Sequence, residues 1–355
     1  MKRLRRDPLR FDAFRLLTEH IVKRNLAVRD PGALESLMEE MRRATTESAK
    51  SNTFLYGQRA EALFEIVVAS LGQVKLLKQE DCGEVYASVD EKLQPPDFRV
   101  VLESGVQLLV EVKNFYQKTP GDQHRQRAEY VAKVRAYADL MKCELLFATY
   151  WARPNLWTLV PEPLYRAAGS DRVLELTEAL TANRMVALGD KLIGTRAPLH
   201  VRAIARGARS ALVGAEQNAT LRAGTSVRVD AIDVFSEHRQ LTEARDLRIA
   251  SFLLMYGGWV ERNVEVQALG DDLEVDIEVG PDPECDTQTE QGFASIGFLS
   301  SMVSRYYRQA TTTEGGEVSG VRMEFSPGYV GDLVTDEHRS DALPLWQFKM
   351  EPRSR

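Results

Sequence analysis

Three side chains suited to hydrolytic chemistry lie on two neighbouring apolar segments: Asp97 on the first, and Glu111 and Lys113 on the second. Alternate residues of a strand point to the same face, so Glu111 and Lys113 share one face. Paired carboxylates can hold a divalent cation that activates water, and an adjacent lysine can act on the water or on developing negative charge. The pattern indicates a candidate metal site with a basic group beside it.

The spacing of these segments predicts a β-hairpin of one particular register. Residues 103–105 (Glu-Ser-Gly) suit a three-residue turn with glycine in the left-handed position. A turn centred on Ser104 places Asp97 opposite Glu111 and Phe98 opposite Val110. A two-residue turn would put the two acids on opposite faces and would also split the apolar residues between the faces, so the three-residue turn is favoured.

Two carboxylates directly opposite each other repel and destabilise a hairpin. A divalent cation between them would remove that repulsion, and oxygen ligands of this kind suit Mg²⁺ or Mn²⁺. The alternative interpretation is a solvated strand face on which the Glu-x-Lys alternation is incidental.

The segment resembles the active-site signature of the PD-(D/E)XK nuclease superfamily, in Pro96-Asp97 followed by Glu111-Val112-Lys113. The resemblance covers roughly residues 53–160. It implies a restriction-endonuclease-like fold and Mg²⁺- or Mn²⁺-dependent hydrolysis of phosphodiester bonds. Asp97, Glu111 and the carbonyl of Val112 would bind the metal, with Lys113 acting on the water or on the phosphate charge.

A helix before the hairpin often adds an acid to the metal site in this superfamily. Residues 57–72 carry one apolar stripe at helical spacing, together with Glu61 and Glu65. Glu61 lies closer to the stripe, and the spacing from Gly57 resembles the first motif of the superfamily. We therefore expect Glu61 to be the fourth catalytic and metal-binding residue, although either glutamate would also suit a solvated helix surface.

A second helix is expected over residues 123–142, followed by buried strands over 143–151 and 156–160. The basic residues near this helix would track a nucleic-acid backbone or form an ordinary solvated face; they are Lys118, Arg125, Arg127, Lys133 and Arg135. Gln123 and Gln126 are candidates for an assisting glutamine on the same helix.

The composition is that of a globular chain of 355 residues and 40.0 kDa. No apolar run is long enough to cross a bilayer, no apolar signal core follows the basic N-terminus, and three distant cysteines suit reduced thiols. These features predict a cytoplasmic location. The absence of a P-loop argues against nucleotide hydrolysis.

The formal net charge of −6 is unevenly distributed. The first 29 residues and residues 196–228 are basic, whereas residues 261–290 are strongly acidic. This asymmetry suggests separate nucleic-acid and protein-facing surfaces, or solvated hairpin faces.

We expect an α/β (α+β) restriction-endonuclease-like core with a mixed sheet flanked by helices. Residues 1–50 would form a helical segment that caps the core or mediates a dimer, and residues 51–170 the nuclease-like domain. Residues 171–355 would form an α+β domain that binds a partner, a ligand or DNA. Its expected elements are helices over 171–184, 241–256 and 290–309, strand-like segments over 188–195 and 226–231, and a hairpin turning at 270–272.

Two further patterns in this last part have alternative explanations. Glu274, Asp276 and Glu278 alternate on one strand face and could bind a cation, but an exposed antiparallel strand gives the same pattern and no basic residue accompanies them. Tyr306 and Tyr307 could stack on bases, although burial of one helix face is favoured.

The function predicted from the sequence is a metal-dependent DNA endonuclease in restriction or antiphage defence, with RNA cleavage still open. Cutting both strands of a duplex would be easier with two active sites, so a homodimer is expected. One alternative is an inactive nucleic-acid-binding or scaffold protein of the same fold. The other is a nuclease effector gated by a partner or ligand on the C-terminal domain.

Overall fold

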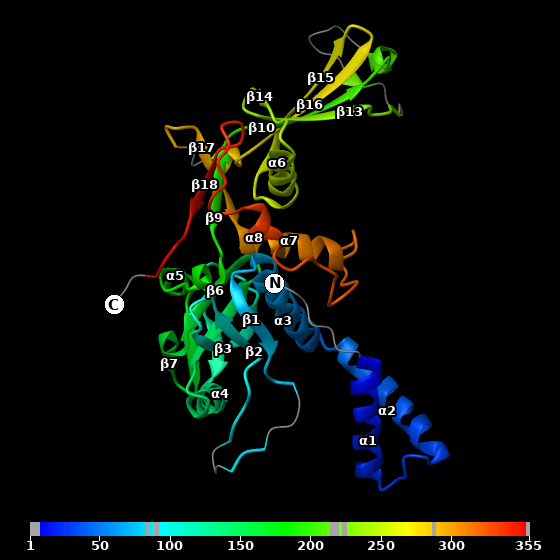
Figure 1. The fold of residues 1–355 in the computed structure, drawn as a ribbon, viewed down its shortest axis with the longest axis vertical. Coiled ribbons are helices and arrows are strands. Elements are labelled where there is room, and N and C mark those ends of the chain that lie inside the picture. Colours follow the sequence, from blue (N-terminus) through cyan, green and yellow to red (C-terminus); the bar gives the residue numbers. More distant parts are fainter. Residues whose placement is uncertain are drawn as a thin grey trace.

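A computed structural model describes residues 8–82, 86–88, 92–213, 220–221, 226–285 and 289–352. The chain begins with a helical hairpin, α1 (Pro8–Arg24) and α2 (Pro31–Lys50), which extends to one side of the rest of the molecule (Figure 1). Asp30 caps α2 by accepting a hydrogen bond from the Gly32 N–H at 2.9 Å. The helices expected before residue 50 are confirmed over the described residues.

The candidate site lies on a five-stranded mixed sheet. Its strands follow the spatial order β1 (Val74–Gln79), β2 (Phe98–Leu102), β3 (Gln107–Phe115), β5 (Glu144–Trp151) and β6 (Leu156–Pro161). Only β3 and β5 are parallel, and the crossover between them contains α4 (Ala128–Leu140). The mixed sheet with flanking helices agrees with the expected fold class.

A helix covers each face of this sheet, so both faces are buried. Phe64 of α3 (Asn52–Leu71) packs in one apolar core with Val110, while Val134 of α4 packs in a second core with Leu109. Double burial explains why β3 reads as an almost continuous apolar run. A charged residue within β3 is therefore buried unless it lies at the end of the strand.

The hairpin between β2 and β3 has the predicted register. Phe98 is paired with Val110 and Val100 with Leu108. Gly105 closes the turn with φ of 89°, a conformation in which glycine is favoured. The turn chemistry and the apolar alternation thus fix the register that brings Asp97 and Glu111 together.

The remaining strands form a second five-stranded sheet and three smaller sheets. They are β4 (His124–Arg127), β7 (Arg166–Ala168), β8 (Asp171–Leu174), β9 (Leu192–Arg196), β10 (Leu199–Ala205), β11 (Leu212–Val213), β12 (Thr220–Leu221), β13 (Ala231–Ser236), β14 (Arg239–Gln240), β15 (Val260–Leu269), β16 (Asp272–Gly280), β17 (Phe293–Phe298) and β18 (Leu345–Phe348). The further helices are α5 (Leu176–Thr181), α6 (Ala244–Tyr256), α7 (Leu299–Thr311) and α8 (Tyr329–Leu333). The second five-stranded sheet has the order β14-β13-β10-β16-β15, and β15 and β16 lie at the end of the molecule far from α1 and α2 (Figure 1).

Several element predictions are corrected by long-range pairing. Residues 124–127 form β4 instead of the first turn of the helix expected over 123–142, because they pair with β8. Strand β8 in turn replaces the first part of the helix expected over 171–184. The helix expected over 290–309 starts only at Leu299, since β17 pairs with β9. The strand-like segment expected from residue 226 begins at Ala231. The expected hairpin at residues 270–272 and the helix over 244–256 are present.

The apolar core does not break at residue 170, the proposed domain boundary. Phe64 of α3 belongs to the same core as Met302 of α7 and Leu333 of α8. Trp157 of β6 also donates a hydrogen bond of 3.0 Å to the hydroxyl of Ser304. The C-terminal part therefore packs directly on the helix that precedes the hairpin.

The acidic face of β16 is paired with basic side chains, contrary to expectation. Arg202 of β10 lies 3.1 Å from both Glu274 and Asp276, and His200 lies 3.1 Å from Asp276. Glu274 and Asp276 are thus paired without a metal, and Glu278 lies 3.9 Å from Arg262. Part of each charged segment lies outside the described residues, namely 1–7, 214–219, 222–225 and 286–288.

Candidate metal centre

Asp97 is held at the start of β2 by two backbone contacts. Its carbonyl accepts a hydrogen bond from the Glu80 N–H at 2.9 Å, which continues the β1–β2 pairing by one residue. Its carboxylate Oδ2 accepts the N–H of Val112 at 2.6 Å. The carboxylate is thus fixed against the middle of β3, and Asp81 is brought close to it as the residue after Glu80.

Three carboxylates converge at this point. Glu61 of α3, Asp81 after β1 and Asp97 each offer an oxygen atom, and these atoms lie within 4.8 Å of one another. Gln58 donates hydrogen bonds of 3.2 and 3.0 Å to the two carboxylate oxygens of Glu61 and so orients it. We refer to Glu61, Asp81 and Asp97 as the acidic cluster.

Glu111 is the most buried carboxylate of the site, with 1% of its surface exposed. Its Oε1 accepts hydrogen bonds from the ammonium of Lys113 at 2.5 Å and from the hydroxyl of Tyr130. Its Oε2 is also buried and has no hydrogen-bond partner among the described residues. A buried acceptor without a partner costs free energy. Because Glu111 is buried, its strand face is not a solvated one, and the alternative interpretation from the sequence is excluded.

Lys113 lies between the buried carboxylate and solvent. Its side chain is 22% exposed, and its ammonium lies 4.8 Å from the centre of the Tyr130 ring on α4. The cation is therefore held against Glu111 by an ion pair and against Tyr130 by its ring, while part of it stays accessible to a ligand.

Burial and mutual repulsion disfavour the ionisation of all the carboxylates of the site at once. Burial, together with the charges of Glu111 and Glu61, raises the pKa of Asp97 to about 8, against the opposing effects of Lys113 and the Val112 N–H. Burial and the nearby charges of Asp81 and Glu111 also raise the pKa of Glu61. Such repulsion disappears when a cation neutralises the carboxylates.

The donor set fits a hard divalent cation. The acidic cluster and Glu111 offer only oxygen atoms, and Oε2 of Glu111 is a buried acceptor that lacks a donor. Mg²⁺ and Mn²⁺ prefer carboxylate oxygens and retain several waters, which suits the partly open side formed by Glu61 and Asp81.

The structure places the predicted residues Glu61 and Asp97 in the acidic cluster, whereas Glu111 and Lys113 form an ion pair whose charges act on Asp97. Glu65 is directed elsewhere, with its carboxylate 3.9 Å from Arg322. Asp81 was not identified from the sequence, because the strand before it was not predicted. Recognising β1 as the edge partner of β2 would have placed residues 80 and 81 beside Asp97.

Other predicted participants lie outside the site. Gln123 and Gln126 are not on a helix; their side chains donate hydrogen bonds to Glu175 and to the ring of His124. Lys133 is paired with Glu129 at 2.6 Å, and Arg135 is paired with Glu162. A continuous basic track along α4 is therefore not formed.

The sequence matches no protein-family model and no curated protein. One similar solved structure is Hjc, a Holliday junction resolvase from the archaeal hyperthermophile Archaeoglobus fulgidus. The two chains are 15% identical, the likeness covers 38% of this chain and 96% of the resolvase, and the TM-score is 0.29. None of the helices in the described ranges is long and apolar enough to span a membrane.

Proposed function

We propose that the chain is a metal-dependent nuclease of the PD-(D/E)XK type that hydrolyses phosphodiester bonds in DNA. The observation that carries the proposal is the buried Oε2 of Glu111, which has no partner among the described residues, on a carboxylate whose charge acts on Asp97 and Glu61 of the acidic cluster. Lys113 on the same strand face supplies the cationic group that phosphodiester hydrolysis needs. A structural ion pair alone would not require three further acids at the same place.

The residues would divide the work as follows. Asp97, Glu111 and Glu61, with Asp81, would hold Mg²⁺ or Mn²⁺, and the Val112 carbonyl is a further candidate ligand. The bound cation would polarise the phosphate and lower the pKa of a bound water. Lys113 would orient that water or neutralise charge developing on the phosphate.

Tyr130 has a positioning role in this proposal. Burial and the negative charge of Glu111 raise the pKa of the Tyr130 hydroxyl well above its usual value, so the hydroxyl remains a donor at neutral pH. By occupying Oε1 of Glu111, Tyr130 leaves Oε2 available for the metal.

The test is cleavage of supercoiled plasmid, single-stranded DNA and RNA with Mg²⁺, Mn²⁺ or EDTA. Glu111→Gln and Lys113→Met should each lower metal-dependent cleavage by at least about 100-fold, the usual range for an essential acid–base group. Glu65→Gln is the matched control, because Glu65 lies one turn of α3 after Glu61 and is directed towards Arg322. Metal-dependent cleavage that survives both site substitutions would refute the assignment.

The biological setting and assembly are also proposals. We propose a cytoplasmic role in restriction or antiphage defence, with RNA as the alternative substrate. A homodimer would place two sites on one duplex, and exposed apolar side chains on α1 and α2 support an interface there; they include Phe14, Leu16, Val22, Leu34 and Met38. Light scattering that shows a monomer at assay concentration would rule out the dimer.

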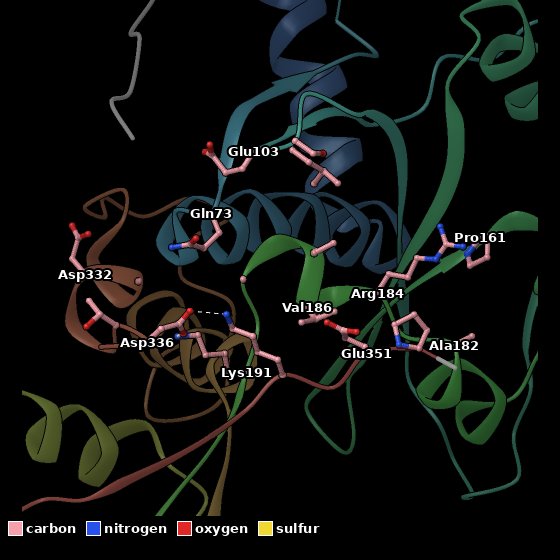
Figure 2. A pocket seen from close by; sticks show the side chains of 18 of the residues that line it. Gln73, Glu103, Pro161, Ala182, Arg184, Val186, Lys191, Asp332, Asp336 and Glu351 are labelled. Carbon is pink, nitrogen blue, oxygen red and sulfur yellow. Dashed lines mark hydrogen bonds and ion pairs between the residues drawn. The ribbon is translucent and has the colours of Figure 1, made fainter. Parts of the chain in front are cut away.

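The gated-effector alternative has one supporting observation. A cavity of about 1100 Å³ lies beside the turn between β2 and β3 and is lined by both halves of the chain, from Gln73 and Glu103 to Lys191 and Asp336 (Figure 2). Lys191 and Asp336 are paired at 2.5 Å, which leaves these charges satisfied within the protein. The cavity is therefore a weaker ligand site than its volume suggests, and we favour an intrinsically active nuclease.

A further inference from the structure

A second cavity borders the segments of α3 and β3 that carry Glu61 and Lys113. It has a volume of about 460 Å³ and is bordered by α3, by the ends of β3 and β5, and by α7. This volume is within the usual range for small-molecule sites. Six of its lining side chains are aromatic or basic: Tyr56, Arg59, Tyr116, Tyr150, Tyr307 and Arg308.

The cavity and the metal centre share two backbone segments. Ala60 lines the cavity and immediately precedes Glu61, while Asn114 lines it and immediately follows Lys113. Neighbouring residues have Cα atoms about 3.8 Å apart. Lys113 and Asn114 face opposite sides of β3, so a nucleotide next to a phosphate at the metal centre would have to pass the end of β3 to reach the mouth of the cavity.

Of the two inner tyrosines, only the partly exposed Tyr150 offers its ring to the cavity, because Tyr307 is buried and has the Arg59 guanidinium 5.1 Å from the centre of its ring. The Tyr150 hydroxyl donates to Oδ1 of Asn155 at 2.8 Å, and the Tyr307 hydroxyl donates to the Val321 carbonyl at 2.5 Å. Both hydroxyls are thus engaged by the protein. What remains for a ligand is aromatic surface, which favours a flat π-system over a sugar or an ion.

The outer tyrosines lie at the cavity with much of their surface free. Tyr116 is 67% exposed and Tyr56 is 47% exposed, although burial of these rings would be favourable. A base that stacks on them would cover this apolar surface. Stacking of this kind contributes about 1–3 kcal/mol per base and tolerates any base.

The two arginines have different roles. Arg59 is buried and donates to the Thr311 hydroxyl at 3.0 Å and to the Gly320 carbonyl at 2.5 Å, so it holds the end of α7 against α3. Arg308 is exposed and forms no ion pair with the described part of the chain. It is available to a phosphate of a strand whose base enters the cavity.

We infer that this cavity receives an unpaired nucleobase of the strand whose phosphate lies at the metal centre. The inference rests on the proposed function and specifies its substrate class. A base inside an intact duplex is stacked on both sides and cannot enter a pocket without being extruded. Single-stranded DNA, or DNA with an unpaired nucleotide at the cut site, is therefore the preferred substrate over an uninterrupted duplex.

The test uses the full chain in EDTA, so that binding is measured without cleavage. Single-stranded oligonucleotides carry 2-aminopurine at one position at a time, and affinity is measured by fluorescence anisotropy of an end label. We expect quenching at one position, and tighter binding of the single strand than of the matched duplex. Tyr116→Ala should weaken single-strand binding about 5- to 150-fold, the equivalent of about 1–3 kcal/mol, and Tyr116→Phe should retain it.

Two further variants distinguish the loss of the Tyr116 ring from general effects on DNA binding. Tyr329→Ala removes a half-exposed tyrosine that lines a different cavity and should leave affinity unchanged. Arg308→Gln should weaken binding and should reduce the slope of log affinity against log salt concentration by about the amount that one phosphate contact contributes. Equal affinity for single strand and duplex, or unchanged single-strand affinity in Tyr116→Ala, would overturn the inference.

The outcomes distinguish this inference from the proposed function. Position-specific quenching without metal-dependent cleavage would keep the base site and overturn the nuclease proposal. Metal-dependent cleavage with no quenching at any position would keep the nuclease and overturn the base site.

Discussion

Replacing Asp97 with asparagine should stabilise the metal-free protein, although most substitutions at buried polar sites destabilise. Asp97 is half-buried and its charge is opposed by those of Glu111 and Glu61, while its Oδ2 accepts one backbone hydrogen bond from Val112. Asparagine retains an acceptor for that bond and removes the negative charge. The net effect is the loss of repulsion without the loss of the backbone contact.

The size of the effect follows from the spacing of the acidic cluster. Two unit charges 4.8 Å apart repel by about 3.5 kcal/mol at an effective dielectric constant of about 20. Glu61 is partly exposed and Asp81 is exposed, so solvent screening lowers this figure. We expect the free energy of unfolding of Asp97→Asn to exceed that of the wild type by about 1–3 kcal/mol.

The assay is urea unfolding at pH 8 in EDTA, followed by the same measurement with Mn²⁺. Saturating metal should stabilise the wild type, by about 2.7 kcal/mol at 100 times the dissociation constant, and should stabilise Asp97→Asn much less. Glu65→Gln is the control: in EDTA it should change the free energy of unfolding by less than about 1 kcal/mol, since its partner Arg322 is 3.9 Å away and exposed. It should keep the full response to Mn²⁺.

Two results would refute this reasoning. One is an Asp97→Asn protein that is clearly less stable than the wild type in EDTA, which would mean that the carboxylate is stabilised by partners and not strained by charge. The other is an equal stabilisation of both proteins by Mn²⁺, which would place the metal elsewhere.

Two other predictions concern the frame around the site. Burial lowers the pKa of His124 to about 3, so as pH falls below about 6.5 the unfolded chain binds a proton that the folded protein does not. Between pH 8 and pH 5 the free energy of unfolding of the wild type should therefore fall by about 2 kcal/mol more than that of His124→Gln. Equal decreases in urea unfolding would contradict this. Arg59→Met should lower the free energy of unfolding by about 2–4 kcal/mol, because the Thr311 and Gly320 acceptors lose a buried charged donor. A thermal unfolding midpoint equal to that of the wild type would show that these contacts do not hold α7 on α3.

The local parts of the site were predictable from the sequence because short-range rules determine them. The glycine at position 105 and the apolar alternation on either side of the turn specify the hairpin register, and helical spacing specifies α3. These two elements place Glu61, Asp97 and Glu111.

The parts that were not predictable depend on distant partners. Asp81 joins the acidic cluster only because β1 pairs with the edge of β2, and β1 has no strong strand pattern of its own. Residues 124–127 carry polar side chains that suit a helix or a strand, and their pairing with β8 decides between the two. The cavity lined by Tyr116 and Arg308 likewise requires α7 to pack on α3, across more than 220 residues of chain.

The most direct test of the central claim is calorimetric titration of the purified protein with Mn²⁺, comparing the wild type with Glu111→Gln and Glu65→Gln. Glutamine at position 111 keeps an acceptor for Lys113 and Tyr130, so the variant should fold while its affinity for Mn²⁺ falls at least about tenfold. Glu65→Gln should bind as the wild type does. A wild type that binds no Mn²⁺ at millimolar concentration, or a Glu111→Gln variant that binds it equally well, would contradict the assignment of a metal centre to this site.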